Sequence, residues 1–383
     1  MKQKKRKVVI VTGGRIEYGY TRPVIREIQK RSDMDYKIIA ANMHLLDDFG
    51  RTIEDIKKDQ FHVDFAVHNT LDGYNHITMV KSLGVFLLQL PELIENLKPD
   101  FIIVAGDRGE QLIGAMVGAH MYIPVAHIQA GELSGNIDGT TRHAITKFAH
   151  IHFAANQDSA ERLRKMGEEP YRIFNVGAPQ LDDLLNGKIT PPLQLRKKLR
   201  LNLSGPLFLV IQHSVTEEAY LAGQHMAETM KAVTKFPYET VIILNNSDTA
   251  SNQIRDSIMQ YRTASTHIFQ HVPRQDYAGL MKIASVLVGN SSSGILEAPS
   301  FHLPAINIGR RQIGRLQGAN VINAGYNAEE ITSAIKKAMG SGFRKMAQKS
   351  SNPYGDGKSA KRIVDILSSI PIDEKLLIKR LTY

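Results

Sequence analysis

Three acidic side chains stand where proton transfer to and from a carbon atom could take place. Asp107 follows the run 101–106, and Glu132 and Asp138 lie in a polar loop after the next apolar run. Neighbouring carboxylates can differ enough in pKa for one to act as a base and another as an acid. The simpler alternatives are a helix N-cap at Asp107 and an ordinary surface loop around the other two. We treat all three as candidate catalytic groups.

A serine-rich turn in the second half has the composition of an anion site. In residues 289–294 a glycine follows an apolar run, and three serines, among them Ser291 and Ser292, begin a predicted helix. Helix N-termini present unpaired N–H groups to phosphate. Glu297, about one turn further on, could accept hydrogen bonds from a ribose diol. Taken alone, serine N-capping is the commoner explanation for such a stretch.

The glycine turn near the N-terminus excludes two classes of nucleotide-binding protein. Gly14 and Gly19 have the spacing of a triphosphate loop, but Tyr20 stands where that loop needs lysine. The Gly-x-Gly-x-x-Gly fingerprint of dinucleotide enzymes is also missing. We therefore expect neither an ATPase or GTPase nor an NAD enzyme. A tight turn and a diphosphate contact through Arg15 remain equally open.

The histidines and the absence of cysteine argue against a metal cofactor. His213 follows the run 207–211 and is the best histidine candidate for a ligand, whereas His127 alternates within a run and should be a packed core residue. No histidine and acid group has the spacing of a zinc site. The chain has no cysteine, which excludes disulfides, thiolate metal sites and a cysteine nucleophile. We expect no cofactor and no metal.

These candidates are positioned by a repeated pattern of short apolar runs, each followed by an amphipathic helical stretch. Such alternation predicts βαβ units and parallel sheets. Ligands of such sheets bind beyond the carboxyl ends of the strands, where the candidates lie. The predicted strands are 8–11, 36–40, 63–67, 101–104, 125–128, 151–154 and 173–176 in the first half, and 207–211, 241–244, 267–269, 286–288 and 305–308 in the second.

The pattern predicts an α/β protein of two Rossmann-like, doubly wound domains that face a central cleft. We place the domain with the carboxylates at 1–180, the nucleotide-binding domain at 181–365 and a helical tail at 366–383. The region 177–206, with its four prolines, is the expected crossover between the domains. The helical stretch from about residue 359 is expected to pack back across the hinge.

The composition fits a soluble protein of two domains. The 383 residues include 43% hydrophobic and 22% charged residues, with a formal net charge of +10. The basic residues are dispersed and aromatic residues make up only 7%, so we expect no nucleic-acid partner. No apolar run approaches the roughly 18 residues of a membrane span, and the basic N-terminus does not resemble a secretory signal. A cytoplasmic protein without membrane contact is expected.

Seven short motifs, in this order, resemble those of the hydrolysing UDP-N-acetylglucosamine 2-epimerases, which include bacterial sialic-acid pathway enzymes. Each motif is weak alone, but together they are highly specific, and the resemblance extends from about residue 8 to 370. The motifs are Thr12-Gly13-Gly14-Arg15-Ile16-Glu17-Tyr18-Gly19, Gly106-Asp107-Arg108, His127-Ile128-Gln129-Ala130-Gly131-Glu132, Arg142-His143-Ala144-Ile145-Thr146-Lys147, Gly289-Asn290-Ser291-Ser292-Ser293-Gly294, the run 307–315, and Tyr354-Gly355-Asp356-Gly357.

The resemblance implies the glycosyltransferase-B shape and a set of site residues. Gln129 departs from the family, because some members have glutamate there, and this makes the role of Glu132 less secure than that of the other carboxylates. The implied catalytic residues are Asp107, Glu132, Asp138 and His213. The implied contacts to the nucleotide sugar are Arg15, His44, Arg108, Arg142, Asn246, Ser291, Ser292, Glu297 and Arg311.

The resemblance also implies a reaction. The C2 proton of a nucleotide-linked N-acetylhexosamine is removed as the nucleotide leaves C1, and water then adds to the resulting 2-acetamidoglucal to give the free 2-epimer. UDP-N-acetylglucosamine yielding N-acetylmannosamine and UDP is the leading expectation, and a UDP- or GDP-linked diacetamido-trideoxyhexose for legionaminic acid stays open. The rivals are a non-hydrolysing 2-epimerase, a glycosyltransferase and a non-catalytic sugar-nucleotide binder. A homodimer or homotetramer is expected.

Overall fold

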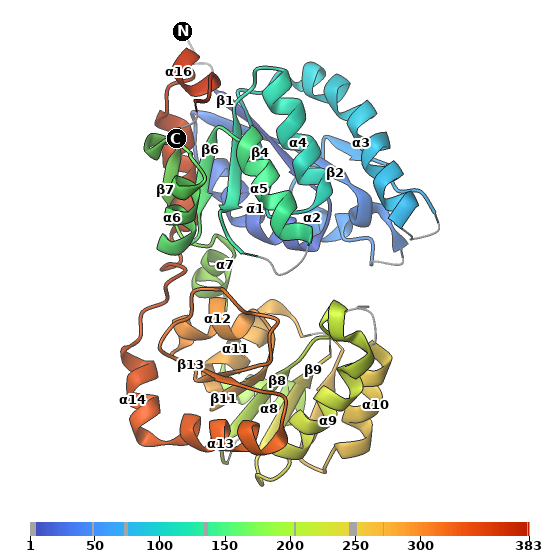
Figure 1. Cartoon of the computed structure of the whole chain (residues 1–383), viewed down its shortest axis with the longest axis vertical. Helices are drawn as coiled ribbons and strands as arrows, with labels where there is room; N and C mark the ends of the chain where they lie inside the picture. Colours follow the sequence, from blue (N-terminus) through green and yellow to red (C-terminus); the bar gives the residue numbers. More distant parts are fainter. Residues whose placement is uncertain are drawn as a thin grey trace. The chain divides into compact units, whose positions relative to one another are not determined.

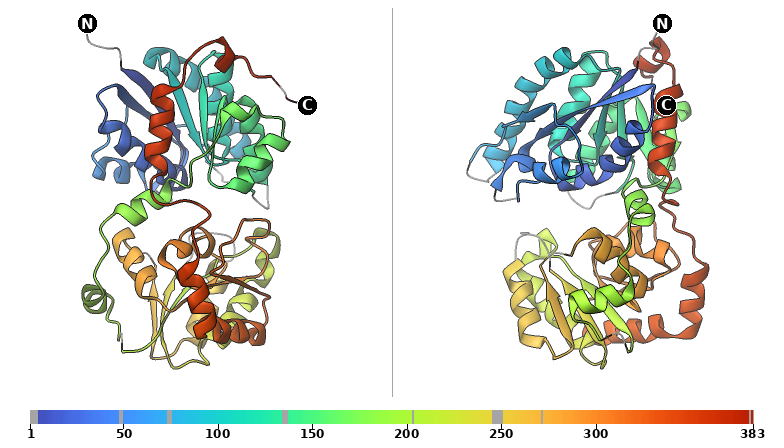
Figure 2. Two further views of the ribbon diagram at one scale, coloured as in Figure 1. Left: turned by 90° about the vertical axis from the view of Figure 1, so that its left-hand side faces the viewer. Right: turned by 180° about the vertical axis from the view of Figure 1, so that it is seen from behind.

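The computed structural model describes residues 5–47, 50–72, 76–133, 137–202, 204–244, 251–270, 272–380 and 382. The chain divides into two compact units, which can be followed by colour in Figures 1 and 2. Unit 1 consists of Met1–Asp183 and Tyr354–Tyr383, and unit 2 of Leu184–Pro353.

Unit 1 is built on a parallel sheet of seven strands in the order β3-β2-β1-β4-β5-β6-β7. The central β1 pairs with β2 and β4, so that Val8 lies opposite Tyr36 and Phe101. These strands are apolar runs because helices cover both faces of a parallel sheet. Their bounds are β1 (Arg6–Thr12), β2 (Met34–Ala41), β3 (Phe65–Val67), β4 (Phe101–Ala105), β5 (Val125–Ala130), β6 (Ile151–Ala154) and β7 (Ile173–Asn175).

Two hydrophobic clusters lie on the two faces of this sheet. One contains side chains of α1 and α15, and the other contains side chains of α3, α4 and α5. Figure 2 shows α15, in red, running beside the blue N-terminal elements. The helices are α1 (Arg15–Gln29), α2 (Ile53–Lys58), α3 (His76–Leu97), α4 (Gly109–His120), α5 (Ile137–Phe148), α6 (Gln157–Lys165), α7 (Gln180–Asn186), α15 (Ser359–Ser369) and α16 (Glu374–Leu377), with 3-10 turns η1 (Asn42–Leu45) and η3 (Pro170–Arg172).

Unit 2 repeats the architecture with six parallel strands in the order β10-β9-β8-β11-β12-β13. Its strands are β8 (Leu207–Ile211), β9 (Glu239–Ile243), β10 (Thr266–Phe269), β11 (Val286–Gly289), β12 (Ala305–Ile308) and β13 (Val321–Ala324). Its helices are α8 (Pro192–Leu199), α9 (Ala222–Val233), α10 (Ser251–Tyr261), α11 (Arg274–Ile283), α12 (Ser293–Leu296), α13 (Ala328–Met339) and α14 (Ser341–Lys349), with 3-10 turns η4 (Thr216–Leu221) and η5 (Ala298–Phe301).

The expected class of two parallel-sheet α/β domains is confirmed. Both strand orders reverse direction beside the first strand of the unit, between β1 and β4 in unit 1 and between β8 and β11 in unit 2. Ligands of doubly wound sheets bind at this topological switch point, beyond the carboxyl ends of the strands. The candidate ligand-binding loops are therefore those after β1 and β4 in unit 1 and those after β8 and β11 in unit 2.

The chain returns to unit 1 earlier than the sequence boundary at 365 implies. Tyr354 already accepts a hydrogen bond from the backbone N–H of Ala178 at 2.7 Å. The carboxylate of Asp182 accepts bonds from the N–H groups of Ser359 and Ala360 at 3.0 and 2.6 Å, which cap α15. The apolar face of α15 then packs in the unit 1 core. Helix α15 therefore belongs to unit 1, and unit 2 ends at Pro353.

One helix corrects the expectation that no segment is apolar enough to span a membrane. Residues Ile77–Leu97 of α3 have a mean hydropathy of 1.5, and the helix is long enough to cross a bilayer. Core helices of soluble proteins pass the same test of length and composition. Only 22% of this window is fully buried, but Leu83, Leu87, Leu93 and Leu97 of the helix also pack against the core of unit 1.

Candidate functional site

Asp107 lies just after β4 and forms an ion pair with Arg142 of α5. The guanidinium of Arg142 is buried, and its Nε and Nη1 have no hydrogen-bond partner among the residues described. Asp107 is not the N-cap of α4, because Arg108 takes that position. Asp107 is thus held by a buried cation from the neighbouring strand–helix unit.

Glu132 follows β5 and is buried, with 4% of its surface exposed. Its Oε2 accepts a hydrogen bond of 3.0 Å from Nδ2 of Asn156, and its Oε1 accepts one of 3.3 Å from the N–H of Leu133. Asn156 is itself fixed, because its side-chain oxygen caps α6 through the N–H of Ser159 at 2.8 Å. This carboxylate is therefore oriented by the start of a helix on the next strand, not by a surface loop.

The third carboxylate, Asp138, belongs to the first turn of α5, and its side chain lies outside the described residues. The same holds for Asn246, which follows β9. Their expected roles remain predictions.

His127 is the packed core histidine that the sequence predicts. It is fully buried in β5 and donates a 2.7 Å hydrogen bond from Nε2 to the carbonyl of Gly106. Burial lowers its pKa to about 3, so the ring is neutral at physiological pH. Gly106 has a φ of 82°, and this left-handed turn directly precedes Asp107. The histidine therefore supports the turn that carries the carboxylate.

Two buried glutamates at the switch point were not among the expected site residues. Glu17 of α1 and Glu110 of α4 are 1% and 3% exposed, and each has a carboxylate oxygen 3.6 Å from Nε of Arg108. The other oxygen of Glu110 accepts a hydrogen bond from Asn42, just after β2. Burial raises the pKa of Glu17 from 4.5 to about 7, against the opposing effect of Arg108. The sequence motif of residues 12–19 contains Glu17, so this residue could have been included among the expected site residues.

The glycine turn after β1 packs against these two acids. A Cβ at Gly13 would lie 3.2 Å from the Glu110 side chain, and a Cβ at Gly14 would lie 3.2 Å from Oε2 of Glu17. The acids therefore lie directly beneath the turn that was expected to admit a diphosphate. Arg15, the first residue of α1, is exposed beside this turn.

His44 is fully buried, in contrast to the exposed Arg15. Its Nε2 lies 2.9 Å from the hydroxyl of Thr12 and its Nδ1 lies 2.7 Å from that of Thr52. Burial lowers the pKa of His44 to about 4. Both ring nitrogens are occupied, so this side chain has no hydrogen-bonding atom left for a ligand. His44 thus links β1 to the segment after η1, and its expected contact with the substrate stays a prediction.

Asn290 organises the switch point of unit 2. It is 1% exposed and bonds the backbone of His213 twice, accepting from its N–H at 2.7 Å and donating to its carbonyl at 2.8 Å. Its own carbonyl accepts from Arg311 at 3.2 Å and from Gln312 at 3.0 Å. One asparagine therefore joins the loops after β8, β11 and β12, and brings the expected residues His213 and Arg311 to one place.

Gly289, just before Asn290, allows these strand ends to approach. Its φ is 136°, and a Cβ there would lie 2.0 Å from the carbonyl oxygen of Ile211. Any larger residue would push the ends of β8 and β11 apart.

The serine turn that follows does not fit simple N-capping, and its expected contact with an anion stays a prediction. Ser292 is the N-cap of α12 but makes no side-chain cap hydrogen bond, so simple capping does not account for it. Ser291 accepts a 3.3 Å bond from the N–H of Ser293. Helix α12 has only four residues, so its dipole is small. Glu297 follows it, half-buried, at the start of η5.

Gln129 has an unusual backbone. Its φ is 65° beside an irregularity in the pairing of β5 with β6, and its side chain donates a 3.1 Å hydrogen bond to Gln180. Left-handed backbone in a residue other than glycine is uncommon and concentrates at functional sites. The turn directs the chain toward Glu132.

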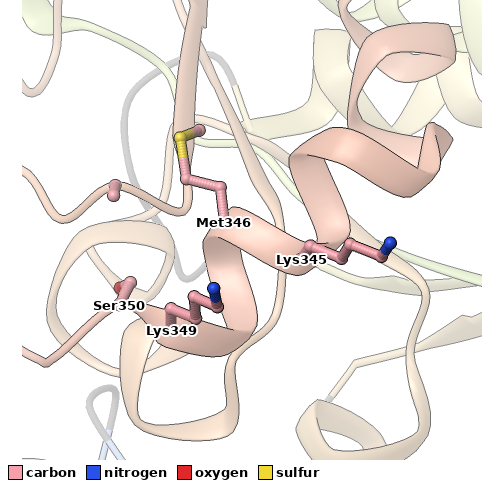
Figure 3. A pocket seen from close by; sticks show the side chains of 5 residues that line it. Lys345, Met346, Lys349 and Ser350 are labelled. Atoms are coloured by element: carbon pink, nitrogen blue, oxygen red, sulfur yellow. The ribbon is translucent and has the colours of Figure 1, made fainter.

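Two cavities in the described part of the chain lie away from these residues. Figure 3 shows one of about 410 Å³ in unit 2, lined by Lys345, Met346, Lys349 and Ser350 of the α14 region together with Ala319. Within the described ranges no cluster of His, Asp and Glu side chains has the arrangement of a metal site. The candidate residues therefore lie on the switch-point loops, which each unit carries at its own sheet.

Two Rossmann-like sheets with charged groups at both switch points define a class of two-domain α/β enzymes of the glycosyltransferase-B-like fold. Residues 26–368 match the UDP-N-acetylglucosamine 2-epimerase family. The chain is 35% identical over 375 residues, 98% of each chain, to UDP-N,N'-diacetylbacillosamine 2-epimerase (hydrolyzing) of Legionella pneumophila. This chain belongs to the UDP-N-acetylglucosamine 2-epimerase family.

Two further comparisons agree with this membership. The chain is 31% identical over 336 residues to UDP-N-acetylglucosamine 2-epimerase of Neisseria meningitidis, covering 87% of each chain. Its fold matches the crystal structure of UDP-GlcNAc 2-epimerase from Neisseria meningitidis bound to UDP-GlcNAc with a TM-score of 0.81 and 20% identity, covering 94% of this chain and 99% of that one.

Proposed function

We propose that this enzyme is a hydrolysing 2-epimerase whose substrate is UDP-N,N'-diacetylbacillosamine. The observation that carries the proposal is the 35% identity to a hydrolysing enzyme for that substrate, extended over 98% of both chains. The site is consistent with it, because the β4 and β5 loops present Asp107 and Glu132 and the unit 2 loops present His213 and Arg311.

The proposed reaction begins with elimination. A carboxylate takes the C2 proton, the C2–H electron pair forms a C1–C2 double bond, and the bond between C1 and the diphosphate oxygen breaks. The nucleoside diphosphate leaves with that electron pair. Water then adds to the 2-acetamidoglucal, its hydroxyl at C1 and a proton at C2 from the opposite face. The product is the free sugar with the inverted C2 centre.

Both steps need acid and base groups on the two faces of the sugar ring. We assign proton transfer to Asp107, Glu132 and Asp138, without dividing the two C2 transfers among them. Arg142 holds Asp107, and Glu17 with Glu110 holds Arg108 at the same switch point. We assign Arg108 to the substrate and place His44 among the supporting residues.

The leaving diphosphate develops negative charge, which preorganised donors and cations stabilise. We assign the stabilisation of the diphosphate to His213, Arg311 and Ser292 of unit 2, together with Arg15 of unit 1. We assign the binding of the nucleoside to Glu297, Ser291 and Asn246. Asn290 fixes the positions of His213 and Arg311. Two buried acids lie beneath the Gly13–Gly14 turn, so we assign that turn to uncharged groups of the substrate.

UDP-N-acetylglucosamine is the second candidate substrate, because the relative from Neisseria meningitidis is 31% identical and named for it. Its product would be N-acetylmannosamine, a precursor for sialic acid. We propose that the enzyme is cytoplasmic in either case. We also propose that its binding partner is a small-molecule nucleotide sugar, the substrate.

The test is a panel of UDP- and GDP-linked N-acetyl and diacetamido sugars, with released nucleotide and free sugar both measured. We expect free UDP and a free 2-epimer to form in equal amounts without an added acceptor, fastest with UDP-N,N'-diacetylbacillosamine. An epimer that still carries its nucleotide would instead identify a non-hydrolysing epimerase. Nucleotide release that requires an acceptor sugar would identify a transferase, and binding without turnover a non-catalytic binder.

A further inference from the structure

The carboxylate of Glu218, in η4 of unit 2, joins the segments that follow β12 and β13. One oxygen, Oε1, pairs with Nε of Arg310 at 2.8 Å, and the other, Oε2, accepts a hydrogen bond of 2.6 Å from the hydroxyl of Tyr326. The Glu218 side chain is only 19% exposed, so both oxygens are engaged in a largely enclosed place. None of these three residues has a role in the reaction assigned above.

The ring of Tyr326 packs against the turn that follows β12. Gly309 in this turn has a φ of 69°, and a Cβ there would lie 2.2 Å from Cζ of Tyr326, so only glycine allows this approach. His225 of α9 stacks on the same ring, with the centroids 3.5 Å apart and the planes at 5°. Burial raises the pKa of Tyr326 to about 12, so its hydroxyl stays protonated and can donate to Glu218.

The turn of residues 309–312 is thus held at both ends. Glu218 holds its first half, and in its second half Arg311 donates a 3.2 Å hydrogen bond to the carbonyl of Asn290. The side chain of Asn290 also holds the backbone of His213, which lies five residues before Glu218 in the chain. These contacts close a ring within unit 2 that fixes Arg311 and His213 relative to each other.

We propose that Glu218 is a positioning residue for the leaving diphosphate, because it holds the turn 309–312 and thereby the guanidinium of Arg311. The inference rests on the proposed function, since it uses the assignment of Arg311 to the diphosphate. A carboxylate would itself repel a diphosphate, so Glu218 acts through Arg310 and Tyr326 and not as a ligand. Cations that are fixed before charge develops on the leaving group need no reorganisation during the reaction.

A general contribution to the stability of unit 2 is the alternative role for this carboxylate, and Glu228 provides the comparison. Glu228 of α9 pairs with Lys231 at 2.7 Å and accepts a 3.0 Å hydrogen bond from the N–H of Ala328. Its contacts therefore join α9 to the start of α13, away from the turn 309–312. If Glu218 only stabilises the fold, alanine at either position should have the same kind of effect.

The first test compares the affinities of UDP and of uridine by calorimetry, with uridine measured in competition. In Glu218→Ala we expect the Kd of UDP to rise about tenfold or more and that of uridine to stay within about twofold, because uridine lacks the diphosphate. Glu218→Gln keeps an acceptor oxygen and should recover part of the affinity. Glu228→Ala should leave both affinities unchanged. Circular dichroism melting establishes that each variant is folded, and Glu218→Gln carries the test if the alanine variant does not fold.

The second test addresses the path through Tyr326. Tyr326→Phe removes only the hydroxyl that donates to Glu218, so it should weaken UDP binding selectively and by less than Glu218→Ala. The double variant of Tyr326→Phe with Glu218→Ala should bind UDP no more weakly than Glu218→Ala alone, because both changes break the same contact.

Four outcomes would overturn the inference: unchanged UDP affinity in Glu218→Ala, equal losses for UDP and uridine, an equal loss of UDP affinity in Glu228→Ala, or full additivity in the double variant. Each of them leaves the proposed function standing, provided that the wild type binds UDP and releases it from a UDP-sugar. A wild type that does neither would overturn the proposed function itself, whatever the Glu218 variants do.

Discussion

Asp107 is the residue for which partner and position agree most directly. It ends the β4 loop at the switch point and pairs with the buried guanidinium of Arg142. We expect Asp107→Asn to fold, because asparagine keeps the shape and can still accept a hydrogen bond, and to lose at least about 10²-fold in kcat. Nucleotide release under saturating substrate measures this.

A matched control for Asp107→Asn is Asp365→Asn. Asp365 lies on α15, away from either switch point, and its carboxylate pairs with Arg31 at 2.9 Å. The Asp365→Asn variant should therefore keep full activity. Near-normal kcat in Asp107→Asn would remove this carboxylate from the mechanism.

Glu17 offers a second residue-scale prediction, which depends on pH. Its pKa is raised by burial from 4.5 in the unfolded chain to about 7, so the folded state binds the proton more tightly. The stability that this proton contributes is present below pH 4.5 and is lost as the pH rises through 7. Each pKa unit corresponds to about 1.4 kcal/mol, so the loss approaches roughly 3 kcal/mol.

We therefore expect the free energy of unfolding to fall less between pH 5 and pH 8 in Glu17→Gln than in the wild type, as measured by urea titration at each pH. The same substitution should flatten the acid limb of kcat/KM near pH 7, because only ionised Glu17 attracts Arg108. Identical pH dependence of unfolding in the two proteins would show that Glu17 does not titrate in this range.

At the scale of elements, variants of the turn from β11 into α12 can distinguish capping of the helix from binding of UDP. Ser292 makes no cap hydrogen bond. We expect Ser292→Ala and Glu297→Ala to keep the melting temperature within about a degree and to weaken UDP binding. The loss for Ser292→Ala should be about 1.5–3 kcal/mol by calorimetry, the usual range for a hydrogen bond to a charged group.

The control at this scale is Asn327, an N-cap residue whose side chain does make the capping hydrogen bond. Asn327 caps α13 through the N–H of Glu329 at 2.7 Å. Asn327→Ala should lower the melting temperature and leave UDP affinity unchanged. If Ser292→Ala behaves like Asn327→Ala, and Glu297→Ala binds UDP normally, the nucleotide binds elsewhere.

At the scale of the whole molecule, the proposed reaction uses groups of both units, and isotopes report on the bonds that change. In D₂O the released sugar should carry deuterium at C2, because the abstracted proton is lost and another is added on the opposite face. In H₂¹⁸O the label should enter the C1 hydroxyl, read promptly before ring-opening exchange, and not the nucleotide. Mass spectrometry of both products measures this.

The isotope pattern discriminates between the reactions that this fold supports. Simple hydrolysis would label C1 without deuterium at C2. A non-hydrolysing epimerase would place deuterium in a sugar still joined to its nucleotide. Oxygen label in the diphosphate would mean cleavage at phosphorus and would leave Asp107 and Glu132 without the proposed role.

The sequence by itself determined the two parallel sheets and the loops that matter. The thirteen described strands include all twelve predicted runs, because buried parallel strands are apolar throughout and the information is local. The missed strand, β13, is a partly exposed edge strand that contains Asn323. Asp107, Glu132 and His213 could be named because the carboxyl ends of parallel strands meet at one edge of a sheet.

Only the tertiary structure decided which partners these side chains have. The burial of His44 between two threonines, the pair of acids around Arg108 and the clamp of Asn290 on His213 all join residues far apart in the chain. Helix α15 belongs to unit 1 because Asp182 caps it and its apolar face fills that core. Periodicity shows that a helix has an apolar face, but the fold decides whether the chain covers it. On α3 it leaves one such face exposed.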